Sequence, residues 1–198
     1  MQCERSYEDV DVLELLDGIR VDTLPVWANK PQPVKSPRTI QIFLASSEEL
    51  LEERKEFDLY FRQRNGELHG QGICLEIIRW ENFFDAMSKT RLQDEYNKAI
   101  RNSDICVCLF LTKVGKFTEE EFDVAYSQFK DSGKPYIYTF FKEATVHIGN
   151  MRVEDIISLD AFKKKLGALG HFYTSYKSID DLKLQFRNQL DKLLEEYD

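Results

Sequence analysis

Three consecutive glutamates, Glu119, Glu120 and Glu121, are the residues of this chain best placed to do chemistry. They follow an apolar run, residues 105–111, which is long enough for a buried strand and too short for a buried helix. Between the two lies a turn in which Gly115 supplies a permissive backbone. A glutamate held there out of water would have a pKa above its reference of about 4.3 and could serve as an acid, a base or a nucleophile.

In the helix expected after this turn, the three glutamate side chains point in different directions. At 100° per residue, the core side of the helix is marked by Phe122 and Ala125. Glu120 then points into solvent, whereas Glu119 and Glu121 flank the core face and can lean over the strand ends. Glu121 stands one turn ahead of Ala125, whose small side chain leaves room for a ligand. Glu121 is therefore the candidate catalytic residue.

A purely structural explanation of the same glutamates stays open. Thr118 is a suitable N-cap, and carboxylates in the first turn stabilise the positive end of a helix. The residue types and their spacing are equally consistent with catalysis and with helix stabilisation.

The elements that would position these residues alternate between strand and helix five times along residues 38–198. We expect strands at residues 39–45, 73–79, 105–111, 136–141 and 171–174. Five helices are expected between and after these strands. The first is capped by Ser46 and Glu49 and ended by Asn65-Gly66, the second spans residues 90–102, and the third starts at Thr118. The fourth spans residues 153–169, and the fifth is capped by Ser178 and runs to about residue 196. Such alternation predicts a five-stranded α/β domain of flavodoxin-like type, with a parallel sheet covered by helices on both faces.

Residues 1–37 stand apart from this domain. Residues 8–19 could form an acidic amphipathic helix, and the prolines between positions 25 and 37 exclude a continuous helix or an inner strand there. We expect a linker or an extended arm, in which Trp27 is either a packing anchor or a contact to another molecule.

In an open parallel sheet, ligands bind at the carboxyl ends of the strands, where the strand order reverses. The segments expected to converge there are residues 44–47, 80–85, 112–121 and 141–143. Together they offer serine hydroxyls, aromatic rings and carboxylates, which suit a polar ligand with a flat ring.

Composition and missing motifs argue against several classes of function. The formal net charge of −8 and the pI near 5.1 argue against direct nucleic-acid binding. No apolar run approaches the roughly 20 residues of a membrane span, and the amino terminus lacks the features of a signal peptide, so we expect a soluble cytoplasmic protein. The chain has no Walker phosphate loop, GxGxxG or GxSxG motif. The cysteines indicate buried reduced thiols, and neither they nor the isolated His147 and His171 suggest a metal site.

The central motif resembles that of TIR (Toll/interleukin-1 receptor) domains, in particular the NAD-consuming ones of bacterial defence proteins. These carry an aromatic residue, usually Trp, four positions before the catalytic glutamate and an alanine four positions after it, and this chain has Phe117, Glu121 and Ala125. Residues 40–47 resemble the opening strand and loop of the family, and residues 99–104 resemble its turn into the third strand. The resemblance covers about residues 38–196.

Three features depart from the family pattern. Phe117 replaces the usual Trp, and Ser46-Ser47 stand where many members have aromatic and basic residues. Residues 80–88 only loosely resemble the loop that borders the NAD site in the family.

The resemblance implies that the chain cleaves NAD+ and releases nicotinamide, with NAD+ as the substrate and no bound cofactor. Glu121 would stabilise an oxocarbenium-like ribose or add to it covalently, as the carboxylates of glycosidases do. The implied substrate-binding residues are Trp80, Phe83 and Phe117 for the rings and Ser46 and Ser47 for phosphate oxygens. These residues do not distinguish ADP-ribose, cyclic ADP-ribose and a base-exchange dinucleotide as the product.

The resemblance also implies an effector in defence or cell-death signalling that becomes active when copies assemble into a homo-oligomer, with residues 1–37 as a switch or a link to a sensor domain. Two alternatives stay open. A non-catalytic TIR-like module would assemble with copies of itself or a partner. A nucleoside deoxyribosyltransferase-like enzyme would also attack ribose C1 with a glutamate after the central strand, although residues 113–117 replace the Asp-Gly-rich approach of that family.

Overall fold

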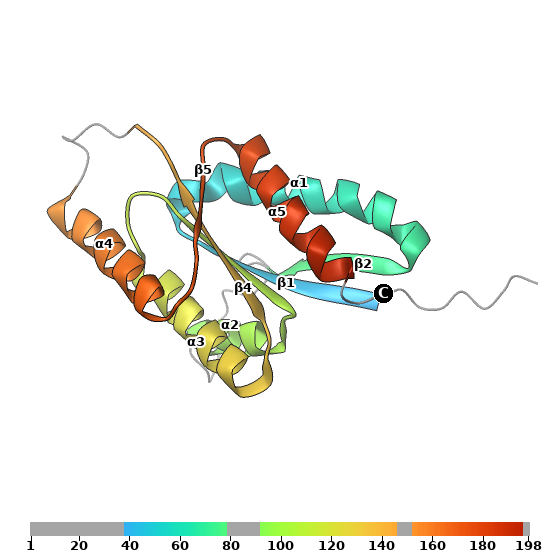
Figure 1. The fold of residues 1–198 in the computed structure, drawn as a ribbon, viewed down its shortest axis with the longest axis horizontal. Coiled ribbons are helices and arrows are strands. Elements are labelled where there is room, and N and C mark those ends of the chain that lie inside the picture. Colours follow the sequence, from blue (N-terminus) through green and yellow to red (C-terminus); the bar gives the residue numbers. More distant parts are fainter. Residues whose placement is uncertain (1–37, 79–91, 146–151, 196–198) are drawn as a thin grey trace, which may run out of the picture. The chain divides into compact units, whose positions relative to one another are not determined.

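A computed structural model describes residues 38–78, 92–145 and 152–195. Its five strands form one parallel sheet in the order β2-β1-β3-β4-β5 (Figure 1). The strands are β1 (Arg38–Ser46), β2 (Ile73–Ile78), β3 (Ile105–Phe110), β4 (Tyr136–Lys142) and β5 (Thr174–Tyr176). This is the strand order of flavodoxin-like folds, and it confirms the predicted five-stranded α/β architecture. The predicted helix at residues 8–19 and the proline-containing arm lie outside the described residues.

Helices cover both faces of the sheet (Figure 1). The helices α1 (Leu51–Leu68) and α5 (Ile179–Glu195) pack on one face. The helices α2 (Leu92–Asn102), α3 (Lys116–Ser132) and α4 (Val153–Ala168) pack on the other. Two short 3-10 turns, Glu48–Leu50 and His69–Gln71, flank α1. None of the helices in the described part of the chain is long and apolar enough to cross a membrane.

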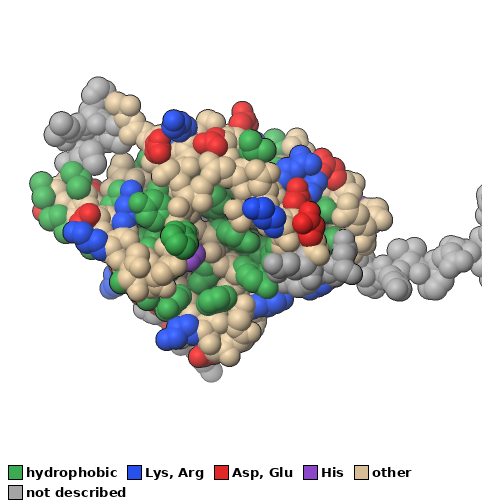
Figure 2. All heavy atoms as spheres, viewed as in Figure 1, with side chains coloured by type: hydrophobic (Ala, Val, Ile, Leu, Met, Phe, Trp, Pro, Cys, Tyr) green, Lys and Arg blue, Asp and Glu red, His purple; other side chains and the backbone are tan. Residues whose placement is uncertain are grey.

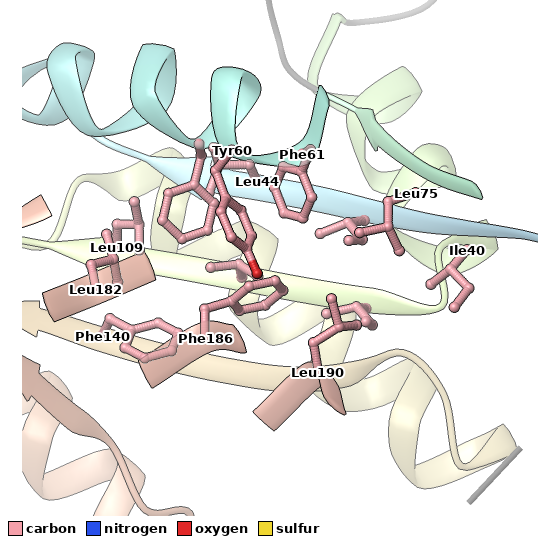
Figure 3. Packing of buried hydrophobic residues seen from close by; sticks show 14 of the residues in the cluster. Ile40, Leu44, Tyr60, Phe61, Leu75, Leu109, Phe140, Leu182, Phe186 and Leu190 are labelled. Atoms are coloured by element: carbon pink, nitrogen blue, oxygen red, sulfur yellow. The ribbon is translucent and has the colours of Figure 1, made fainter. Parts of the chain in front are cut away.

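The face covered by α1 and α5 holds an aromatic core. Phe61 and Phe186 meet edge to face with ring centroids 5.6 Å apart, and Tyr60 lies against both (Figure 3). Leu44 and Leu109 of the sheet complete this layer from below. Alternate residues of each central strand point to this face, and the residues between them point to the opposite face. Because helices cover both faces, the apolar runs of β1 and β3 are continuous rather than alternating.

The opposite face buries smaller groups. Cys106 and Cys108 of β3 lie next to each other beneath Phe122 and Ala125 of α3, and all four side chains are fully buried. The two sulfur atoms are 3.8 Å apart, well beyond the roughly 2.05 Å of a disulfide bond. The prediction of buried reduced thiols is confirmed for these two cysteines, whereas Cys74 is half-buried and Cys3 lies outside the described residues.

The first helix differs from its prediction at both ends. Asn65-Gly66 do not end α1, which continues to Leu68. Instead, the Asn65 amide donates to the Leu75 carbonyl oxygen at 2.9 Å and accepts from the Leu75 N–H at 2.6 Å, so its tertiary role overrides its tendency to end a helix. The predicted capping box is also wrong, because α1 begins at Leu51 without a side-chain cap.

Two further boundaries differ. The helix α3 begins at Lys116 with Gly115 as N-cap, so Thr118 is a buried residue of the first turn and not the cap. The last strand is β5 at Thr174–Tyr176, because His171 is used in closing α4: its N–H donates to the Leu166 carbonyl oxygen at 3.0 Å. The predicted Ser178 cap is confirmed, since the Asp181 N–H donates to its hydroxyl oxygen at 3.2 Å.

Candidate active site

The strand order reverses between β1 and β3, so the ligand crevice expected of this fold lies beyond Ser46 and Phe110 at their carboxyl ends. The loops after these two strands are tied together. Glu49 accepts hydrogen bonds from the Thr112 hydroxyl and from the Thr112 N–H. This contact explains why Glu49 does not cap α1.

Glu121 lies in the second turn of α3, on the side of the helix that faces the sheet and α2. Its side chain is only 7% exposed. Gln93, in the first turn of α2, is close enough to lower the pKa of Glu121, and Cys108 of β3 is close enough for the Glu121 charge to raise the pKa of that thiol further. The candidate catalytic glutamate is therefore a buried residue near the carboxyl end of the sheet.

Burial raises the pKa of Glu121 from its ordinary 4.5 to about 7. The Gln93 hydrogen bond opposes this rise, and the negative charge of Glu120 adds to it. Near pH 7 the protonated and ionised forms of Glu121 are therefore present in similar amounts. Such a carboxyl group can donate a proton, accept one, or act as an anion toward a developing positive charge.

Two buried amides of α2 connect to Glu120, the neighbour of Glu121 in sequence. The Gln93 amide nitrogen donates to Asn97 Oδ1 at 3.3 Å, and Asn97 Nδ2 donates to Glu120 Oε1 at 2.9 Å. The sequence-based expectation that Glu120 points away into solvent is therefore wrong, since its carboxylate reaches back to α2. Glu120 also lines an open groove of about 510 Å³.

The first glutamate of the three has a different environment. Glu119 forms an ion pair with Lys165 of α4 at 2.9 Å, and the same lysine binds Asp123 at 2.7 Å. All three side chains remain substantially exposed. Helix stabilisation and ion pairing account for Glu119, but they leave the burial of Glu121 unexplained.

The two serines of the first loop are engaged with other parts of the protein. The Ser46 hydroxyl oxygen accepts a hydrogen bond from Arg54 of α1 at 3.2 Å, so it lies on the α1 side of the sheet, across from Glu121. Ser47 donates to Glu49 at 3.3 Å, and its carbonyl oxygen accepts from Arg54 at 3.1 Å. The structure does not bring the Ser46 hydroxyl together with Glu121.

Of the predicted aromatic substrate-binding residues, the structure describes Phe117. Phe117 lies one turn before Glu121 on α3 and is 60% exposed, which leaves its ring available to a ligand. Ala125, one turn after Glu121, is fully buried. The predicted ring-binding residues Trp80 and Phe83 lie outside the described residues.

Gln93 and Asn97 are the site residues that sequence reasoning missed. They are four residues apart on a predicted helix, which places them on one face, and both are buried. A pair of amides at this spacing, on the helix before the central strand, was the signal available. Within the described residues, no three His, Cys, Asp or Glu side chains lie close enough together to hold a metal ion.

Comparison with solved structures shows a similarity that is limited in extent. No family model matches the chain, and no curated protein matches it. The solved structure of the CMP N-glycosidase BcmB from Clostridium botulinum is similar at 15% sequence identity and a TM-score of 0.44, over 74% of this chain and 98% of that one. A likeness of this size assigns neither a family nor a substrate to this chain.

Proposed function

We propose that this protein cleaves the N-glycosidic bond of NAD+, with Glu121 as the carboxylate that acts on the ribose. The observation that carries the proposal is the burial of Glu121 beside the carboxyl ends of β1 and β3, with its pKa raised to about 7. A carboxylate withdrawn from water interacts more strongly with a developing positive charge than an exposed one does. The spacing of Phe117, Glu121 and Ala125, which resembles that of NAD-consuming TIR domains, supports the choice of substrate.

The proposed reaction needs little from the protein besides this carboxylate. As the bond between ribose C1 and nicotinamide breaks, its electron pair moves to the ring nitrogen, and nicotinamide leaves as a neutral molecule. The ribose becomes oxocarbenium-like, and ionised Glu121 stabilises it or adds to C1. Water then attacks C1 and loses a proton, and where Glu121 has added to C1 its bond to C1 breaks and the carboxylate is restored, which gives ADP-ribose.

The charge of the substrate fits the pKa of Glu121. The nicotinamide ring of NAD+ carries a fixed positive charge, and a positive charge near a carboxyl group lowers its pKa. Binding of NAD+ therefore shifts Glu121 toward the ionised form that the reaction needs. A substrate whose base is uncharged while attached to the ribose, such as CMP, would not do this.

The remaining parts of the proposal concern binding and activation. Phe117 borders the nicotinamide ring, and Trp80 and Phe83 contribute further ring contacts. Activity depends on association of several copies, as the TIR resemblance implies, and serves a defence or cell-death signal.

The test is an incubation of concentrated protein with NAD+, with and without a crowding agent, in which nicotinamide release is followed by chromatography. Glu121→Gln keeps the size of the side chain and removes the charge, and we expect it to lower turnover about 10³-fold. Glu119→Gln is the matched control, because Glu119 is exposed and paired with Lys165.

The alternatives give different outcomes. Hydrolysis of CMP in preference to NAD+, lost in Glu121→Gln, would keep the N-glycosidase and replace its substrate. Turnover unaffected by Glu121→Gln would contradict the role of this residue. No turnover at any protein concentration, combined with self-association seen by light scattering, would favour the non-catalytic assembly module.

A further inference from the structure

We infer that a groove lined by lysines, at the carboxyl ends of β3, β4 and β5, binds the diphosphate of the substrate. The inference rests on the proposed function for the identity of the ligand, since NAD+ joins its two nucleosides through a diphosphate. Binding of phosphate groups in the groove can be tested without any turnover.

The groove has a volume of about 730 Å³ and lies where three neighbouring strands end. Lys142 is the last residue of β4, Lys177 directly follows β5, and Thr112 lies just beyond β3. Lys163 of α4 also lines the groove. In parallel α/β sheets, ligands bind at this edge.

Two of the lysines are held in place from opposite faces of the sheet. Lys142 forms an ion pair with the buried Glu53 of α1. Lys163 Nζ lies 4.7 Å from the ring centre of Phe141 and 5.3 Å from that of Tyr173, so the two rings support the ammonium group. A cation that is already ordered loses less conformational freedom when an anion binds to it.

Lys163 and Lys177 have no ion-pair partner within the described residues. The nearby Asp181 accepts a hydrogen bond from the main-chain N–H of Lys177 at 2.9 Å. Among the described residues that line the groove, exposed Glu143 has the only carboxylate. The groove therefore carries an excess of positive charge in a chain whose formal net charge is −8, and such a local excess attracts anions.

Other parts of the site suit a diphosphate less well. The groove beside Glu120 is lined by more carboxylates than cations: Glu119, Glu120, Asp123 and Asp131 against Arg101 and Lys116. The hydroxyl groups of Ser46 and Ser47, which were expected to bind phosphate oxygens, are hydrogen-bonded to Arg54 and Glu49. Lysine ammonium groups, in contrast, are common partners of phosphate oxygens.

One loop joins the lysine groove to the helix that carries Glu121. Thr112 lines the groove, and Gly115, three residues later, is the N-cap of α3. The Val114 N–H donates to the Ser158 hydroxyl oxygen at 3.2 Å, which ties this loop to α4. A dinucleotide that crosses the loop would place its diphosphate among the lysines and its nicotinamide riboside on the side of Glu121.

The first measurement is the binding of inorganic pyrophosphate to the full chain by isothermal titration calorimetry. Lys163→Gln and Lys177→Gln should each weaken binding about tenfold, because each removes a charge-assisted contact. Glu143→Gln should tighten binding, because it removes the opposing charge. The matched control is Lys164→Gln, since Lys164 is exposed, pairs with Asp160 and does not line the groove.

Two results would overturn the inference. One is a parent protein that binds no pyrophosphate, and the other is an affinity that neither lysine variant changes. Lys177 is exposed, so its variant keeps the test decisive if Lys163→Gln does not fold.

The kinetic arm compares two substrates. In Lys163→Gln and Lys177→Gln, the KM for NAD+ should rise about tenfold with kcat nearly unchanged, because the diphosphate lies away from the bond that breaks. Nicotinamide riboside contains the same bond but no phosphate, and its kcat/KM should be the same in the parent and in both variants. An equal loss for the two substrates would contradict a diphosphate subsite.

The two proposals fail in different ways. Pyrophosphate binding that the lysine variants lose, in a protein without NAD+ turnover, would support the groove as a phosphate site and contradict the proposed reaction. NAD+ turnover with a KM that neither lysine variant changes would keep the reaction and overturn the subsite.

Discussion

The two faces of the sheet bury ionisable groups in different ways. On the side of α1, Glu53 is 2% exposed and forms an ion pair with Lys142, and Arg54 donates to the Ser46 and Ser47 carbonyl oxygens. On the side of α3, Glu121 is also buried, but it forms no ion pair among the described residues, and burial raises its pKa to about 7.

The two kinds of buried group suit different roles, one in stability and the other in catalysis. A buried charge with a matched partner holds the loops of the sheet in place, and breaking the pair leaves an uncompensated charge. A buried carboxyl group without a cation weakens the fold whenever it is ionised, which is a property expected of a catalytic group. Exposed apolar residues occur on both sides, with Leu59 on α1, Leu184 on α5, and Val153, Ile156 and Ile157 on α4. Figure 2 shows hydrophobic side chains at the surface of the face in view.

The largest effect on stability is expected on the α1 side. Lys142→Met should lower the free energy of unfolding by about 3 kcal/mol, because Glu53 then remains buried without its partner. Urea denaturation measures this loss. The control is Lys165→Met, which breaks exposed ion pairs and should cost less than about 1 kcal/mol. Equal losses in the two variants would contradict the distinction between the faces.

The opposite sign is expected at Glu121. Its folded pKa of about 7 lies above the ordinary 4.5, so the folded protein binds the proton more tightly and loses stability as the pH rises through this range. Glu121→Gln does not titrate, and between pH 5 and pH 8 its stability relative to the parent should increase by about 2 to 3 kcal/mol. Unfolding curves at the two pH values test this, and Glu119→Gln should show no such increase.

A smaller effect concerns the pH dependence of cleavage. We expect kcat/KM for NAD+ to rise with pH and to level off above about 7, because the ionised form of Glu121 is the active one. The midpoint for kcat should lie at lower pH, since the bound nicotinamide cation lowers the pKa of the carboxyl group. Initial rates between pH 5 and pH 9 measure both midpoints. A rate that decreases through pH 7 would instead indicate an acid role.

The smallest effect is expected at Phe117. Because its ring is 60% exposed, Phe117→Ala should change the free energy of unfolding by less than about 0.5 kcal/mol. The KM for NAD+ should rise about three- to tenfold through loss of ring contact. Phe129→Ala, at an exposed position of the same helix, should leave the KM unchanged. An unchanged KM in Phe117→Ala would remove this residue from the site.

The sequence predicted most of the fold because the relevant signals are local. The apolar run of β3, the turn at Gly115 and the Ser178 cap depend on neighbours in the chain. Asn65-Gly66 failed as a stop signal because the Asn65 side chain is satisfied by Leu75 of another element. Local preference gave way there to a tertiary contact.

The candidate site was predictable in part for the same reason. The helical spacing around Glu121 gave its position near the core, and the structure buries it. The direction of Glu120 was wrong, and Gln93 was missed, because both depend on how α2 packs against α3. No spacing within a single helix contains that information.

The contact between Asn65 and Leu75 also has a consequence for how copies of the protein can meet. The strand β2 is the outermost strand on its side of the sheet, where unpaired main-chain groups normally offer a template for another strand. The Asn65 amide occupies both the N–H and the C=O of Leu75, so an incoming strand would have to displace two hydrogen bonds at the middle of this edge. A single side chain thus protects the β2 edge of the sheet against pairing with a strand of another copy.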